Sequence, residues 1–266
     1  MITLLRIEYK KLAGYVPFWV LMGIHYGLLF ICLASLTAFA EQFEFNGLGF
    51  TFSNEVFYGY PDIWQNLAYF SKFFAIFLAI LVITSVTNEY TYRTNRQNII
   101  DGLSRSQFIT SKVLLVFALA IFGGVFVWLS GTLLGLGYAK EPGNYFQGME
   151  FLPAYVLSVA GLYTVALLFA VLIRKASLSI LALLGYITIM QGLYAWKMPD
   201  AIRPYLPLKA FGSLVPESFR RYVPIDTESI AGEIIEYVPI DKLIASGGWL
   251  VVLISLCYYI ESRRDL

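Results

Sequence analysis

The residues of this 266-residue chain that could take part in covalent chemistry are few and scattered. There is one histidine, His25, and the two cysteines, Cys32 and Cys257, lie in apolar runs near opposite ends of the chain. Ser130 precedes a glycine, but Trp128 stands where intramembrane serine proteases of the rhomboid type carry another glycine. The sequence lacks the Gly-x-x-x-x-Gly-Lys-Ser/Thr phosphate loop, the His-Glu-x-x-His zinc motif and Cys-x-x-Cys. We therefore expect no catalytic residue, no metal site and no ATP hydrolysis by this chain itself.

His25 lies inside a long apolar run, where a polar side chain could line a pathway through a membrane. A hydrogen-bonded packing role is the favoured interpretation, because the run contains no second ionisable group. His25 stands between Gly23 and Gly27, and Gly131 and Gly135 repeat this Gly-x-x-x-Gly spacing. Small residues at that spacing let another helix approach closely, within the chain or in a dimer. An intramembrane enzyme stays as an alternative, which a cluster of polar side chains in one pocket would favour.

The elements that carry these residues must be largely covered by lipid. Hydrophobic residues make up 58% of the chain and charged residues 14%, compared with about 45–50% and about 25% in soluble proteins. This composition excludes a soluble enzyme, a disordered chain and a disulfide-stapled domain, and the net charge of +1 gives no reason to expect nucleic acid as a partner. We predict an all-α, multi-pass membrane protein that forms one domain over 1–266, because runs of about 20 apolar residues can each span a bilayer. The predicted spans are 12–40, 67–87, 113–138, 151–173, 178–196 and 243–260.

The basic residues predict how these six spans are oriented. Eleven of the 19 lie in the N-terminal tail, the links 88–112 and 174–177, and the C-terminal tail, whereas the link 41–66 has none. Lys and Arg accumulate on the cytoplasmic side of membrane proteins, so both termini are predicted to be cytoplasmic. The link 197–242 carries six basic residues, but long loops count little in this rule. The first run is too long for the core of a signal peptide, and we interpret it as an uncleaved span.

Three connections have a pattern of their own. Residues 1–11 place apolar side chains at helical spacing beside basic ones, which favours a helix on the membrane surface over simple positive flanking. The link 88–112 predicts a helix over 89–101 that ends at Gly102, and then a new helix opened by a capping box of Ser104 and Gln107. Such a link could bind a cytoplasmic partner, and a solvated loop with caps is the alternative.

The proline-rich link 197–242 is predicted to form a helical cap on the outer side of the membrane, with a substrate gate as the alternative. Within it, 206–215 is apolar enough to dip into the membrane or lie on it, and 229–237 could form a short amphipathic helix.

The segments MITLLRIEYKKL at 1–12, TNEYTYRTNRQ at 87–97 and DGLSRSQF at 101–108, followed by Lys112, bear a resemblance to a known family. They resemble the membrane subunit of bacterial ATP-binding-cassette exporters of the second type. The resemblance implies a six-span permease in the cytoplasmic membrane that pairs with a second permease subunit, identical or different. It also implies a separate cytoplasmic ATPase that binds ATP and Mg²⁺, so this chain itself would need no cofactor.

The resemblance further implies that the ATPase contacts the N-terminal helix and the element after the second span, called the coupling element. The residues expected there are Glu89, Tyr92, Arg93, Thr94, Arg96, Gln97, Asp101, Gly102 and Arg105. Dimer contacts through the first span would place Gly23, His25 and Gly27 at an interface. A membrane scaffold that does mechanical or assembly work on an envelope complex, without cargo, is the alternative function.

Overall fold

The computed structural model describes residues 2–42, 57–139, 145–196, 199, 201–218 and 235–263. Within these ranges the regular secondary structure is entirely helical, as the sequence predicts. Five helices in the described ranges are long and apolar enough to cross a membrane. They are α2 (Val16–Gln42), α4 (Ile63–Thr91), α6 (Arg105–Tyr138), α7 (Phe151–Ile173) and α10 (Ile240–Arg263).

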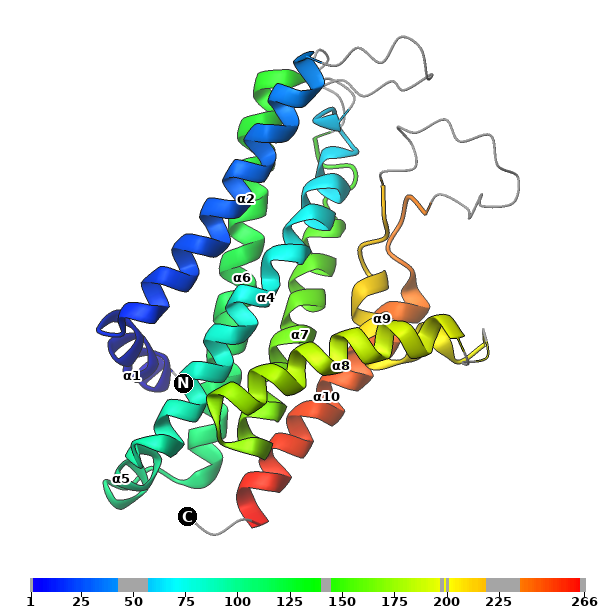
Figure 1. Cartoon of the computed structure of the whole chain (residues 1–266). Helices are drawn as coiled ribbons and strands as arrows, with labels where there is room; N and C mark the ends of the chain where they lie inside the picture. Colours follow the sequence, from blue (N-terminus) through cyan, green and yellow to red (C-terminus); the bar gives the residue numbers. More distant parts are fainter. Residues whose placement is uncertain are drawn as a thin grey trace.

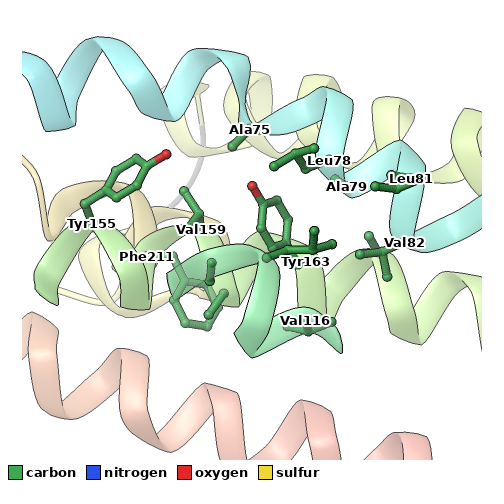
Figure 2. Close-up of a cluster of buried hydrophobic side chains, with 14 of the residues drawn as sticks. Ala75, Leu78, Ala79, Leu81, Val82, Val116, Tyr155, Val159, Tyr163 and Phe211 are labelled. Carbon is green, nitrogen blue, oxygen red and sulfur yellow. The ribbon is translucent and has the colours of Figure 1, made fainter. Parts of the chain in front are cut away.

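The central helix of the bundle is α4, which packs against α2, α6 and α7, while α7 also contacts α6 and α10. Figure 1 shows α1 (Ile2–Ala13) and the C-terminal end of α10 at the same end of this bundle. The core between α4 and α7 is tightly filled: Figure 2 shows Tyr155 and Tyr163 of α7 reaching toward Ala75, Leu78 and Ala79 of α4. All of these side chains are buried.

The span predicted over 178–196 differs in the structure. The helix α8 (Ala176–Trp196) is present, but it runs across the direction of α4 and α7 instead of along them (Figure 1). The reason is the junction before it: Arg174 has a left-handed backbone with φ of 59°, and α8 starts two residues later. The apolar run 178–196 therefore remains only a predicted span.

Two short helices bring the chain back into the bundle after α8. They are η1 (Arg203–Tyr205) and α9 (Pro207–Ser213), and α9 packs against α7 and α10. Phe211 of α9 is buried against Gly161 of α7, where a Cβ atom would collide with the ring. The apolar segment 206–215 thus inserts between helices, while the amphipathic helix predicted over 229–237 falls mainly outside the described residues, as do parts of the links 41–66 and 139–150.

The link after α4 is partly as predicted. The capping box at Ser104 is confirmed in both directions, with the Gln107 amide bonded to the Ser104 hydroxyl and the Ser104 amide bonded to the Gln107 side chain. The continuous helix predicted over 89–101 is wrong. Helix α4 ends at Thr91, Arg93 has φ of 55°, and the short helix α5 (Thr94–Ile100) follows in a new direction.

Candidate functional site

The most unusual group of side chains in the bundle is a buried charge cluster centred on Lys112. Its side chain is fully buried near the start of α6. The Lys112 ammonium donates to Glu8 of α1 at 2.7 Å and to Glu89 of α4. Ser111 donates a further hydrogen bond to the Glu8 carboxylate at 2.9 Å. One lysine therefore holds two acidic residues that are far apart in the sequence.

Glu89 extends this cluster to α5 and back to α1. Its second carboxylate oxygen accepts from Lys11 at 3.1 Å and from the Asn98 side-chain amide at 3.2 Å. We call Glu8, Lys11, Glu89, Asn98 and Lys112 the Lys112 cluster. Its two acids and two lysines balance in charge, and its members come from α1, α4, α5 and α6. The cluster thus joins these four helices at one end of the bundle.

Burial makes the Lys112 cluster sensitive to the loss of any member. Taking charges out of water is costly, and the cost is offset only while each charge keeps its partner and its hydrogen bonds. Removing one partner of a buried pair typically destabilises a protein by about 3–5 kcal/mol. The four helices are therefore expected to move as one unit, because separating them would expose or unpair these charges.

A second polar group joins α4, α7 and α10 at the same end. The Tyr90 hydroxyl donates to Glu261 at 2.7 Å, and Arg174 lies 3.3 Å from the same carboxylate oxygen. The Arg174 guanidinium also lies over the Tyr90 ring, 4.7 Å from its centroid. We call the end of the bundle that contains the Lys112 cluster and this group the charged end.

The residues expected to contact a partner divide into two sets in the structure. Glu89 retains only 6% exposure and is an internal member of the Lys112 cluster, so it is not an exposed contact here. Arg105 is half-buried and donates to the carbonyl of Ser262 in α10 at 3.3 Å. The other predicted residues are exposed on or beside α5: Tyr92, Arg93, Thr94, Arg96, Gln97, Asp101 and Gly102. The surface available to a partner is therefore α5 and the turns at its two ends.

The predicted packing glycines also form two sets, one that contacts other residues of this chain and one that does not. At Gly131 a Cβ atom would lie 2.7 Å from the Trp64 ring, and at Gly135 it would collide with Tyr60, so both glycines admit aromatic rings within this chain. Gly23 and Gly27 have open space around them and make no such contact. Their proposed place in a dimer interface stays a prediction.

His25 is buried in the bundle, as a packing residue would be. Its Nδ1 donates to the carbonyl of Phe74 in α4 at 2.7 Å, and its ring packs edge-on against Tyr26. This bond fixes α2 to α4 at mid-length.

The opposite end of the bundle, which we call the aromatic end, is held by Tyr58, Tyr60, Trp64 and Tyr145. Trp64 donates to the Tyr145 carbonyl at 2.9 Å, and Tyr58 donates to the Leu33 carbonyl at 3.1 Å. Burial is the main reason that the pKa of the Tyr58 hydroxyl lies well above its usual range, so this group stays a donor. The Trp64 ring and the Tyr58 hydroxyl thus both donate to backbone carbonyls.

Between the two ends, Lys72 of α4 holds the inserted helix α9. Its ammonium donates to the carbonyl oxygens of Gly212 at 3.1 Å and Val215 at 2.7 Å, and it lies 4.2 Å from the centre of the Tyr69 ring. A cation at the C-terminal end of a helix satisfies carbonyls that have no partner within the helix. Lys72 thus fixes the end of α9 inside the bundle.

Sequence reasoning missed the partners that make these groups. Glu8 could have indicated a buried partner. Leu5 lies three residues before it and Leu12 four residues after it, so all three share one face of α1. An acid on the apolar face of a surface helix needs a buried cation. Nothing local identified Glu261 as the partner of Tyr90 and Arg174, since these three residues lie on α4, after the end of α7 and on α10.

The Lys112 cluster joins four helices through ion pairs and hydrogen bonds. Within the described ranges, no three His, Cys, Asp or Glu side chains lie close enough to hold a metal ion. No family model matches the chain, and no curated protein is significantly similar to it. The class that the structure itself defines is therefore an all-helical protein with several helices suited to a membrane.

Proposed function

We propose that this chain is the membrane-spanning permease subunit of an ATP-driven exporter in a bacterial cytoplasmic membrane. The observation that carries the proposal is the Lys112 cluster beside an exposed α5. A partner that pushes on α5 would displace Asn98, and through Glu89 and Lys112 it would displace α4, α6 and α1 together. This is the mechanical link that a separate ATPase would need in order to move helices within a membrane.

In this proposal the chain itself does not bind ATP or Mg²⁺, which belong to the ATPase partner. The ATPase must bind two conformations of the permease with different free energies, because otherwise its cycle could not shift the equilibrium between them. The exposed face of α5 supplies the contact, and the Lys112 cluster transmits it. A second permease subunit would complete the pathway for cargo, and the open surface around Gly23 and Gly27 is a suitable place for that contact.

The first test is purification of the full chain from its native membrane in mild detergent, followed by identification of the proteins that co-purify. We expect a stoichiometric subunit that carries a phosphate loop. Tyr92 is 75% exposed beside α5, and Tyr92→Glu should release that subunit. Phe146, an exposed aromatic residue before α7, supplies the matched control Phe146→Glu, which should leave the complex intact. A chain that purifies without any ATPase would contradict the proposal.

A second measurement distinguishes the transport of cargo from mechanical work. Vesicles that contain the complex should lose or accumulate cargo when ATP is supplied, and Tyr92→Glu should abolish this ATP dependence. An intact complex that hydrolyses ATP but carries nothing across the membrane in its native vesicles would favour the scaffold.

A further inference from the structure

A basic groove of about 400 Å³ lies at the charged end, where α4, α5 and the junction between α7 and α8 meet. Four of its lining residues are cations, and none of its described lining residues is acidic. The groove is lined by Tyr90, Thr91, Arg93, Asn95, Arg96, Arg174 and Lys175. Neither the Lys112 cluster nor the exposed outer face of α5 explains this concentration of positive charge in a hollow.

The backbone at this groove is unusual. Arg93 and Arg174 are the two non-glycine residues with positive φ in the described part of the chain, at 55° and 59°, and both line the groove. Each follows the end of a long helix, a place where glycine or asparagine adopts this conformation at lower cost. Strain of this kind is concentrated at functional sites. An arginine at both positions indicates that the side chain is needed in the groove.

Arg174 is held in position with bonding capacity to spare. Glu261 and the Tyr90 ring fix its guanidinium, as described above, and its Nε is buried without a hydrogen-bond partner. A guanidinium presents donors in a planar fork that matches the oxygen atoms of a phosphate. The groove therefore combines a fixed donor with other cations around a space large enough for a phosphate group.

The surface next to the groove distinguishes between a lipid and a soluble anion. Helix α8 begins at Ala176, directly after Lys175, and its N-terminal end adds the favourable side of a helix dipole. Leu178, Leu181 and Leu184 are exposed along one side of α8, and Leu181 retains 66% of its surface. A basic groove that continues into an apolar strip fits a molecule with a phosphate at one end and acyl chains at the other.

We propose that this groove binds the phosphate headgroup of an anionic lipid, whose acyl chains lie along α8. Arg93, Arg174 and Lys175 contact the phosphate, and Leu178, Leu181 and Leu184 contact the chains. The proposal does not depend on an ATPase partner and would hold equally for a transporter or a scaffold. It requires only that the charged end lies at the level of the lipid headgroups.

The test uses the full chain in nanodiscs of phosphatidylcholine, to which phosphatidylglycerol is added, with bound lipid measured by native mass spectrometry after gentle release. The double variant Arg93→Gly/Lys175→Gln removes two cations, and glycine preserves the backbone conformation at position 93. The control Lys209→Gln/Lys242→Gln removes two cations of α9 and the start of α10, away from the charged end. Because each cation near an anionic lipid raises its affinity by a factor of about five, we expect binding about 25-fold weaker in the groove variant and little change in the control.

Each outcome of this test bears on the proposal. Equal loss in both variants would show a general charge effect and would overturn it, as would unchanged binding in the groove variant. Inorganic phosphate is the second probe. If phosphate alone protects the protein from thermal unfolding as well as phosphatidylglycerol does, the ligand is a soluble anion and the lipid assignment is wrong. Protection by phosphatidylglycerol alone, lost in the groove variant, supports the lipid.

Discussion

At the charged end, Glu8, Lys11, Glu89 and Lys112 join helices through ionised side chains, whereas at the aromatic end the rings of Trp64 and Tyr58 bond to backbone carbonyls. At the aromatic end, Gly131 also has no side chain, which leaves room for the Trp64 ring. The Lys112 cluster joins four helices through bonds between side chains, whereas the rings of Trp64 and Tyr58 are held by packing and by bonds to the backbone. We therefore expect a displacement of one helix at the charged end to carry the others with it, and the aromatic end to hold its shape.

The largest expected effect comes from a variant that breaks the ion pairs of the charged end. Lys112→Met should destabilise the protein by about 3–5 kcal/mol, because Glu8 and Glu89 would remain buried without their common cation. Unfolding in detergent, followed by circular dichroism, measures the loss. The triple variant Glu8→Gln/Glu89→Gln/Lys112→Met removes the charges together and should recover much of the stability. A single variant as stable as the unmodified chain would show that the cluster does not hold the helices.

The next change addresses the region between the ends. Lys72→Met should cost about 1.5–3 kcal/mol, because two carbonyls at the end of α9 would lose a charged donor. The effect should be local, with faster amide hydrogen exchange in 207–215 and unchanged exchange in α1. Lys209 is an exposed lysine of α9, and the control Lys209→Met should leave exchange in this segment as it was. Equal exchange in both variants would contradict the role given to Lys72.

A smaller effect sharpens the description of the aromatic end. Gly131→Ala should destabilise the chain by about 1–3 kcal/mol, because the new methyl group would lie 2.7 Å from the Trp64 ring. Gly137 is on the same helix with open space around it, and Gly137→Ala should be neutral or stabilising by up to about 1 kcal/mol. Thermal unfolding in the same detergent compares the two. Identical midpoints would mean that this end is more pliable than its packing suggests.

The smallest effect concerns an ion pair in contact with solvent. Asp241 lies 2.7 Å from Lys242 at the start of α10, and half of its side chain is exposed. Asp241→Asn should change stability by less than about 1 kcal/mol, since exposed pairs contribute little. A loss as large as that for Lys112→Met would remove the distinction between buried and exposed charge on which the comparison depends.

The sequence predicted what local chemistry determines. The amphipathic spacing of 1–11 gave the helix α1, and the pair Ser104 and Gln107 gave the capping box and the start of α6. Both signals lie within a few residues of one another, so no knowledge of the rest of the fold was needed. The apolar runs that became α2, α4, α6, α7 and α10 were predicted for the same reason.

Tertiary contacts determined what the sequence could not reveal. Arginine at 93 gives no local sign of a left-handed turn, and the apolar run 178–196 does not differ in composition from a true span, although α8 runs across the bundle. Glu89 was predicted to contact a partner, whereas the structure buries it in the Lys112 cluster. Its burial depends on Lys112, 23 residues later, and on α1 at the beginning of the chain.

The capping box at Ser104 also sets the position of Lys112 along α6. It fixes where α6 starts, and eight residues of helix, roughly 12 Å, then carry Lys112 to its place between Glu8 and Glu89. An insertion of one residue between 105 and 111 would rotate the lysine by about 100° around the helix axis. Natural length variation should therefore be found in the turn 101–103 and be absent from 104–112. The spacing between the cap and the lysine would thus be inherited as a unit.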